Sequence, residues 1–247
     1  MTAEASQGFY AYGIVPSDRT DLPGEGLGFG EPRLAAVGPV AVVGEWVDLQ
    51  ENLARKRYLT AHTDVLNALA QSGPVLPLQF GSVLADDGDA VTDLLAANQD
   101  WYAERLSEVE GQSQYVLRAR YDLDEMLAQL VESDPEVARL RERTKDRPEE
   151  ERHDERVRLG QLVQSAMEAQ QSEDATWLEG RVAPFVSAIS PRAVGGMDGL
   201  AELAVAVSPA QVAEFEAAAE ELAAEVHPWA RLSLVGPMAM YDFVPNG

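Results

Sequence analysis

The first part of the chain contains short apolar runs separated by turn-forming residues. Residues 8–15, GFYAYGIV, are aromatic and β-branched and stop at Pro16, a pattern typical of a β-strand. A glycine- and proline-rich segment at 17–32 predicts a loop. The apolar run 33–47 is divided by a Gly-Pro dipeptide at 38–39, which marks a turn, so the run predicts two short strands.

The spacing of apolar residues becomes helical after residue 48. Between Leu49 and Gln71 the steps of three and four predict a helix whose buried face carries Leu59, His62, Leu66 and Leu69. The apolar run 73–87, GPVLPLQFGSVLADD, predicts a strand, in which Pro77 cannot donate to a ladder and so favours an edge or a bulge. A second helix is predicted to run to Glu108, because a cluster of acids favours a helix N-terminus: Asp86, Asp87 and Asp89.

A long helical region follows a further strand in the second half. Residues 113–122, SQYVLRARYD, alternate between apolar and polar and predict a half-buried strand. From there to Trp177 the pattern predicts two helices joined by a solvated segment, since the first part is charge-dense and contains Pro135 and Pro148. The second part has an apolar stripe that we expect to pack on the second sheet or on the helix at 209–226: Leu159, Leu162, Val163, Ala166 and Met167.

The last part of the chain repeats the strand and helix signals. The runs 181–193 and 199–208 predict two strands, and 230–244 predicts a final one. Pro209 suits the first position of a helix capped by Ser208. That helix has a seam with steps of three and four: Val212, Phe215, Ala219, Leu222 and Val226.

These elements predict an α+β protein with two domains, 1–111 and 112–247. Each domain is expected to be a small mixed or antiparallel sheet with helices and ferredoxin-like elements, the first domain in a modified form. The order β-α-β-β-α-β after residue 112 is that of the ferredoxin-like split βαβ unit, here with long helices.

Charge and composition narrow the possible partners. The formal charge of −23 repels phosphate backbones and anionic lipid surfaces, which argues against nucleic acid and membrane partners. The acids concentrate at 86–110 and 202–225, whereas 132–158 is nearly balanced. The chain has no cysteine, so disulfides and thiolate sites are excluded. No signal peptide and no apolar run of about 18 to 20 residues is evident, so we expect a soluble, intracellular protein without membrane insertion.

Candidate catalytic and metal-binding residues are few. His62 lies on the apolar helix face, where a structural role is favoured over a ligand role. His153 and His227 share no metal-binding spacing with it or with each other. The acids at 86–93 lack the glycine and glutamate positions of a calcium loop, so helix capping is favoured.

Nor do the other motifs form a catalytic set. Gly24, Gly26, Gly28 and Gly30 alternate but are not followed by Lys-Ser/Thr and do not open a helix, which favours a flexible loop over a phosphate cradle. There is no Gly-x-Ser-x-Gly motif and no defined acid/base pair, so we expect no metal, no cofactor and no enzyme activity.

Three blocks resemble the gas vesicle protein L/F family: FYAYGIV near the N-terminus, LTAHTDVLNALAQSGPVLPLQFGSVL in the middle and RLSLVGPMAMYDFV near the C-terminus. The resemblance covers essentially the whole chain. Members typically have arginine where this chain has Gln79, and their last block is richer in proline and tryptophan. The residues that match the family motifs, for which the resemblance implies structural roles, are His62, Pro77, Gly81, Gly236, Pro237, Tyr241 and Phe243.

The resemblance implies a cytoplasmic accessory or minor structural protein of gas vesicles, without catalysis, that contacts the hydrophobic shell protein and other accessory proteins during assembly. In this light the run 73–87 is a core strand bent at Pro77 and at Phe80-Gly81. We expect the shell protein to bind the first domain, with Trp46 and Phe80 as contact candidates. The alternative is a small-molecule or haem enzyme on a ferredoxin-like scaffold, with His62 or His227 as axial ligand.

Overall fold

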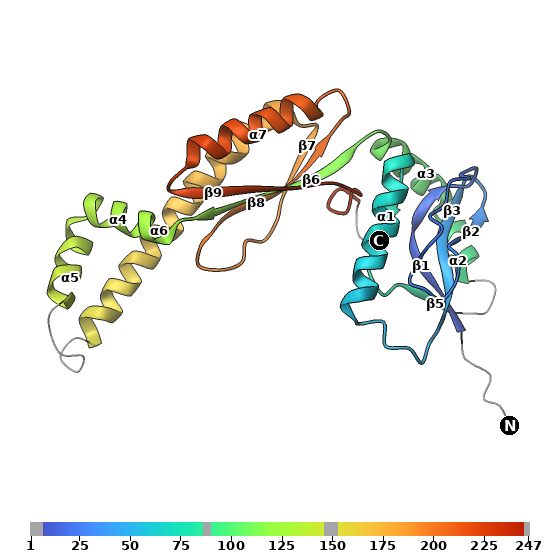
Figure 1. The fold of residues 1–247 in the computed structure, drawn as a ribbon, viewed down its shortest axis with the longest axis horizontal. Helices are drawn as coiled ribbons and strands as arrows, with labels where there is room; N and C mark the ends of the chain where they lie inside the picture. Colours follow the sequence, from blue (N-terminus) through green and yellow to red (C-terminus); the bar gives the residue numbers. More distant parts are fainter. Residues whose placement is uncertain (1–6, 86–89, 146–152, 245–247) are drawn as a thin grey trace. The chain divides into compact units, whose positions relative to one another are not determined.

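The computed structural model describes residues 7–85, 90–145 and 153–244 (Figure 1). The chain divides into two compact units: unit 1 comprises residues 1–115, 206–209 and 236–247, and unit 2 comprises 116–205 and 210–235. These units differ from the ranges 1–111 and 112–247 chiefly at the C-terminus. The difference arises because Ala239 and Met240 are buried in the cores of unit 1.

The sheet of unit 1 is built around one fully buried strand. Its strands are β1 (Gln7–Pro16), β2 (Arg33–Val37), β3 (Val40–Asp48), β4 (Leu76–Pro77) and β5 (Val83–Ala85). The order is β2-β3-β1-β4, with β5 also paired to β1, and these pairs are antiparallel. The predicted turn at 38–39 is confirmed, and Gly38 provides the positive φ of +62° that it requires.

The run 73–87 forms two short strands rather than one. Both pair with β1, and between them the chain makes a turn in which the Ser82 amide donates to the Gln79 carbonyl at 3.1 Å. Gly81 has a φ of +91° in this turn, which interrupts the ladder. The prediction of a bend at Phe80 and Gly81 is therefore confirmed, but the bend is sharp enough to end the strand.

Three helices cover the two faces of this sheet: α1 (Lys56–Ser72), α2 (Ala90–Ala96) and α3 (Gln99–Val109). Helix α1 begins later than predicted, and Leu59 is exposed, because the buried face is centred on other residues: Tyr58, His62, Val65, Leu66 and Leu69. The single helix predicted up to Glu108 is two helices, separated at Asn98, whose ψ of 22° leaves the helical range. Asp86, Asp87 and Asp89, the predicted caps, lie outside the described residues.

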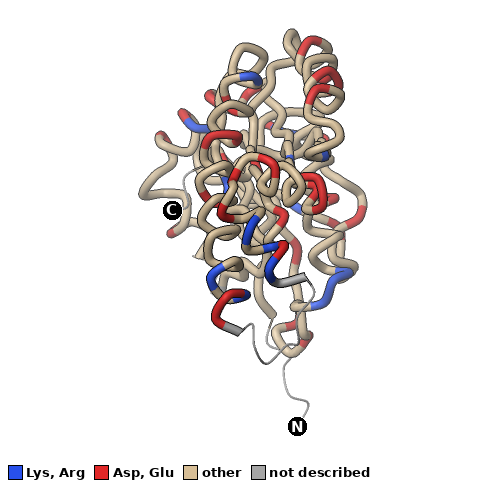
Figure 2. The backbone as a smooth tube through the Cα atoms, turned by 90° about the vertical axis from the view of Figure 1, so that its left-hand side faces the viewer, with Lys and Arg blue, Asp and Glu red and all other residues tan. Residues whose placement is uncertain are grey.

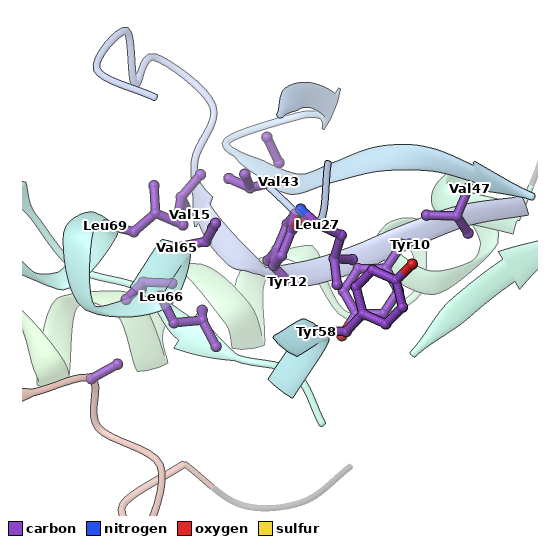
Figure 3. Packing of buried hydrophobic residues seen from close by; sticks show 13 residues of the cluster. Tyr10, Tyr12, Val15, Leu27, Val43, Val47, Tyr58, Val65, Leu66 and Leu69 are labelled. Atoms are coloured by element: carbon purple, nitrogen blue, oxygen red, sulfur yellow. Dashed lines mark hydrogen bonds between the residues drawn. The ribbon is translucent and has the colours of Figure 1, made fainter. Parts of the chain in front are cut away.

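The alternation of side chains along β1 creates two cores. On one face, the α1-side core includes Tyr10, Tyr12, Val43, Leu66 and Leu69 (Figure 3). On the other face, the α3-side core includes Phe9, Ala11, Val42, Leu95 and Leu106. Because a strand buried on both faces carries apolar side chains throughout, β1 reads as a continuous apolar run instead of alternating.

The second sheet has the strands β6 (Ser113–Tyr121), β7 (Ala188–Pro191), β8 (Gly199–Val207) and β9 (Ala230–Met238). Their order is β7-β8-β6-β9. With helices α4 (Leu123–Ser133), α5 (Pro135–Lys145), α6 (His153–Val182) and α7 (Val212–Val226), the chain order is β-α-β-β-α-β. Numbering the strands one to four along the chain gives the spatial order 2-3-1-4, so the ferredoxin-like prediction is confirmed.

Within its described residues, the helical region before β7 contains three helices, not two. The predicted interruption at Pro135 is confirmed, because α4 ends at Ser133. A new helix, α5, begins at Pro135, because a proline at the first helical position needs no hydrogen-bond partner and the Asp134 carboxylate caps the amide of Glu136 at 2.7 Å. Helix α6 continues past Trp177 to Val182. Pro148 lies outside the described residues.

The apolar stripe at 159–167 is only half-buried, so its prediction as a core stripe is wrong. The first half of α6 lies beside α5, to which it is joined by the Arg158–Glu136 ion pair at 2.8 Å and by Arg143–Glu155. The fully buried positions of α6 come later, at Leu178 and Val182. The balanced charges of 132–158 thus serve partly as helix-to-helix ion pairs.

The C-terminal elements are shorter than predicted. Helix α7 begins at Val212 instead of Pro209, but its seam is confirmed, with Phe215, Leu222 and Val226 buried. The first predicted strand shrinks to β7 because α6 and a 3-10 turn (Ala183–Phe185) occupy its start. Strand β9 ends at Met238, and the residues that follow pack into unit 1.

Candidate functional site

A pocket of about 500 Å³ lies along the β4 edge of the first sheet and is here called the β4 pocket. Its walls come from α1, from the segment between β4 and β5, from α2 and α3, and from the C-terminal residues. The lining is largely apolar and aromatic, including Leu59, Leu78, Phe80, Trp101, Tyr102 and Tyr241. A concave apolar surface of this kind suits an apolar ligand or partner segment.

His62 lies in the wall of the β4 pocket and is 2% exposed. The Gly81 amide donates to the Tyr10 hydroxyl at 3.1 Å, and this hydroxyl lies 2.9 Å from His62 Nδ1. Because Tyr10 accepts the Gly81 proton, it can donate its own to Nδ1, which places the imidazole proton on Nε2. The ring also stacks on Tyr12, at 5.6 Å between centroids.

Burial keeps the His62 imidazole neutral, since desolvation lowers its pKa to about 4. The Leu78 carbonyl opposes this shift, although it does not form a hydrogen bond of ordinary geometry with Nε2. Burial likewise raises the pKa of Tyr10 to about 12, so its phenol remains a donor. The structural role predicted for His62 fits this network, in which Nδ1 is occupied and Nε2 carries the proton.

His62 is expected to make the free energy of unfolding fall on acidification. Its folded pKa of about 4 lies below the usual 6.5, so between these values the unfolded chain binds a proton that the native chain does not. About 3 kcal/mol is lost once the pH is below the folded pKa, at about 1.4 kcal/mol per pKa unit. Urea denaturation between pH 7 and pH 4 measures it.

The variant His62→Gln removes this titration and should have the shallower pH dependence. His227→Gln is the control, because it replaces a histidine that is exposed at the end of α7 and lies outside the buried network of His62. Equal slopes for the wild type and His62→Gln would contradict the assignment of the buried neutral imidazole.

The two predicted contact residues lie on opposite faces of the first sheet. Trp46 on β3 is 39% exposed and packs edge-on against Phe9, at 5.3 Å between centroids, which belongs to the α3-side core. Phe80 is half-buried, packs on the α1-side core and lines the β4 pocket. The structure therefore does not bring Trp46 and Phe80 together. Trp101, 37% exposed, is the exposed tryptophan that lines the pocket with Phe80.

The remaining family-motif residues also belong to unit 1. Pro77 pairs with Gly13 in the short strand β4, and Phe243 packs on the α3-side core. Gly236 has a φ of +154°, and a Cβ there would lie 2.6 Å from the Tyr115 ring, so only glycine fits before Pro237. Burial raises the pKa of Tyr241 to about 12, and its hydroxyl faces the side of α1 that carries Thr63.

Comparison with known proteins places the whole chain in one family. The model of the family described as gas vesicle synthesis protein GvpL/GvpF matches residues 8–245. The chain belongs to the GvpL/GvpF family. This membership associates it with gas vesicles, and it agrees with the three sequence blocks that resemble the family.

Individual relatives support the assignment. Gas vesicle protein F of Streptomyces sp. (strain CB03234) is 29% identical over 240 residues, covering 95% of this chain and 98% of the relative. Gas vesicle protein F of Microcystis aeruginosa (strain PCC 7806) is 24% identical over 163 residues, or 65% of this chain and 66% of the relative.

Solved structures of GvpF share the fold. The crystal structure of GvpF from Anabaena sp. PCC7120 superposes with a TM-score of 0.80 at 19% identity, covering 98% of this chain and 100% of that one. That of GvpF from Microcystis aeruginosa gives 0.78 at 20% identity, covering 97% and 99%. The two-sheet α+β fold is therefore that of GvpF structures.

One functional feature of this GvpL/GvpF chain is not evident from its motifs. Glu45 on β3 is 1% exposed and accepts hydrogen bonds from the Tyr12 hydroxyl and from the amides of Leu27, Phe29 and Gly30. Backbone amides of the glycine loop at 24–30 thus bind a carboxylate, but this carboxylate belongs to the chain itself. The contact attaches the loop to the sheet. The only sequence signal is a single acid inside the apolar run VAVVGEWV.

Charge is spread over the surface of this GvpL/GvpF chain without a metal-binding cluster in the described ranges. Acidic positions outnumber basic ones along the backbone (Figure 2). No group of three or more His, Asp or Glu side chains suited to a metal is found among residues 7–85, 90–145 and 153–244. Within the same residues, no helix combines the length and the apolar character needed to cross a bilayer.

Proposed function

We propose that the chain is a cytoplasmic, non-enzymatic accessory or minor structural protein of gas vesicles, which takes part in their assembly by binding the hydrophobic shell protein and other vesicle proteins. The observation that carries this proposal is the match to the gas vesicle synthesis family over residues 8–245, nearly the whole chain. The fold adds no function by itself, because ferredoxin-like sheets occur in many classes of protein.

The β4 pocket is the proposed shell-protein site. Its lining includes Phe80, Leu59 and Trp101, and desolvated apolar and aromatic side chains supply most of the energy of protein interfaces. A surplus of acids over the rest of the surface would keep the complex soluble while an apolar partner is bound. The pocket therefore joins the predicted candidate Phe80 to a second aromatic residue, Trp101.

The haem alternative finds little support in the geometry of the histidines. A haem iron needs the lone pair of an imidazole nitrogen, but Nδ1 of His62 is held by Tyr10 and Nε2 carries the proton. Moving that proton to Nδ1 would break the hydrogen bond with Tyr10 or reverse it. His227 lies exposed beyond α7 and lines none of the pockets described here.

Trp101→Ala is expected to reduce capture of the shell protein by about 10-fold or more, since losing a central aromatic contact costs about 2 kcal/mol. The full-length chain is tagged, co-expressed with the shell protein and recovered, and the amount of shell protein retained is measured. Trp46→Ala is the matched control, because it removes a tryptophan of similar exposure that does not line the β4 pocket.

Full-length variants are required for this experiment. A fragment of residues 1–111 would lack Ala239 and Met240, which are buried in the cores of unit 1. If the wild type retains no shell protein, the proposed function is wrong. If Trp46→Ala loses the shell protein and Trp101→Ala does not, the contact lies around Trp46 on β3 and the β4 pocket is excluded.

A further inference from the structure

Unit 2 contains a pocket that the proposed function does not use. Its volume is about 390 Å³, and it lies where β6 ends, among α4, α6 and the residue before β9. We call it the Asp174 pocket, after the only charged side chain among the described residues of its lining. The other lining residues that matter below are Tyr121, Met126, Gln129, Gln170 and Trp229.

The Asp174 carboxylate is hydrogen-bonded but has no cationic partner. The Tyr121 hydroxyl donates to Oδ2 at 2.8 Å and the Gln170 amide nitrogen donates to Oδ1 at 2.8 Å. No Lys, Arg or His nitrogen lies within 4.0 Å of this carboxylate in the described part of the chain. Neutral donors orient the two oxygens while leaving the negative charge uncompensated, and a partly buried uncompensated charge favours binding of a counter-charge.

The protonation state of Tyr121 agrees with its role as a hydrogen-bond donor to Asp174. Burial and the hydrogen bond to Asp174 hold the pKa of the phenol above its usual range, so Tyr121 stays protonated and acts as a donor. Trp177 packs against the pocket residue Trp229, at 6.4 Å between ring centroids, and has Arg181 over its ring, but Arg181 is already paired with Glu225 at 2.6 Å. The chain therefore supplies no cation of its own to Asp174 in the described ranges.

The walls of the pocket are suited to a flat or alkyl cation. Tyr121 and Trp229 place two aromatic rings side by side, with centroids 6.2 Å apart and planes tilted by 39°. Aromatic faces attract guanidinium and ammonium groups, and the buried Met126 side chain adds a polarisable apolar wall. The Gln129 amide adds a further acceptor at the pocket, and the volume suffices for one arginine-sized group.

We propose that the Asp174 pocket binds a guanidinium or alkylammonium group, with Asp174 as the counter-charge and Tyr121 and Trp229 as the aromatic wall. Binding forms charge-assisted hydrogen bonds to a carboxylate that neutral donors already hold in place. The cation is either the side chain of a basic residue of a partner protein or a free organic cation, and the two sources share this chemistry.

The test uses the purified full-length chain and its four tryptophan indole resonances in ¹⁵N NMR spectra. The probes are agmatine and the capped peptide Ala-Ala-Arg-Ala-Ala, and the neutral control is the same peptide with citrulline in place of arginine. Saturable shifts of the Trp229 resonance, assigned with Trp229→Phe, are expected with the two cations and absent with citrulline. Tighter binding of the peptide would assign the site to a partner's basic residue, and tighter binding of agmatine would assign it to a free cation.

Asp174→Asn should weaken binding of both cations by at least about 10-fold, since it removes the charge while keeping the shape. The matched control is Glu173→Gln, which removes the same charge from the neighbouring exposed position of α6 outside the pocket, and should change the affinity by less than about 2-fold. Circular dichroism checks that each variant is folded. Equal losses in the two variants, equal binding of citrulline, or no saturable shift of Trp229 would overturn the proposal. None of these outcomes depends on the shell protein, so failure here leaves the proposed function intact.

Discussion

Glu45→Ala is expected to lower the free energy of unfolding of unit 1 by about 3–5 kcal/mol, because it removes the acceptor of several buried donors. The carboxylate is 1% exposed and binds the Tyr12 hydroxyl and three backbone amides of the loop at 27–30. Without it, these groups must stay unsatisfied or the loop must leave the sheet and expose Leu27, which is part of the α1-side core.

Hydrogen exchange of peptides from β1 and α1, measured as a function of urea, reports this free energy for unit 1 alone. Glu45→Gln keeps the shape and one acceptor but loses the charge, so its effect should lie between those of the wild type and the alanine variant. Glu104→Ala is the control for loss of a surface acid, because its side chain is 66% exposed, and it should change the free energy by less than about 1 kcal/mol. A loss below about 1 kcal/mol for Glu45→Ala would show that the loop is not held by this carboxylate.

Leu178→Ala is expected to lower the free energy of unfolding of unit 2 by about 2–5 kcal/mol, the range for truncating a buried leucine. Its side chain is 1% exposed on the part of α6 that packs against α7, where Arg181 and Glu225 also pair. Truncation should leave a cavity, since closely packed cores relax only partially. The measurement is the urea dependence of hydrogen exchange in peptides from β8 and α7.

The matched control for this variant is Leu162→Ala on the same helix. Leu162 is only half-buried and lies on the half of α6 that faces α5, so its loss should cost less than about 1.5 kcal/mol. The apolar stripe at 159–167 suggests the opposite from the sequence, namely that Leu162→Ala destabilises the protein more than Leu178→Ala. A larger effect for Leu162→Ala than for Leu178→Ala would restore the stripe as a core element.

The proposals for the two pockets concern different parts of the chain and are tested with different partners. The β4 pocket in unit 1 has a largely apolar lining and is proposed to bind a hydrophobic protein, whereas the Asp174 pocket in unit 2 presents a carboxylate and two aromatic rings. A chain that contacts more than one vesicle protein would need sites of different chemistry. The two tests measure separately whether the β4 pocket binds the shell protein and whether the Asp174 pocket binds a cation.

Local patterns predicted the kinds of element well and their limits less well. The aromatic run at 8–15 is β1, and the seam of α7 is buried as its spacing predicts. The interruption predicted at Pro135 is confirmed, but the sequence did not show that a new helix begins at this proline, which the Asp134 cap supports. Leu59 fits the helical period but is exposed, because the core contacts the adjacent side of the α1 helix.

The candidate sites were less accessible to such patterns. Phe80 was predicted as a contact residue and does line the β4 pocket, whereas Trp46 falls on the opposite face, because successive residues of a strand point to opposite sides. Trp101 was not predicted, since nothing in its own helix indicates that the end of the chain and the β4–β5 segment lie next to it. In the sequence, nothing distinguishes Asp174 from the other acidic residues of its helix.

The sequence by itself determined the α+β class, the β-α-β-β-α-β order of the second sheet, the acidic surface and the resemblance to a gas vesicle family, because these follow from local periodicity, composition and short motifs. Only the tertiary structure decided which side chains meet. Tyr10 reaches His62 across 52 positions, and Tyr121 reaches Asp174 across 53. Local preference cannot specify such pairs, because they form only when sheet pairing and helix packing close the chain on itself, and that closure also brings residues 239–241 into unit 1 to complete its cores and the wall of the β4 pocket.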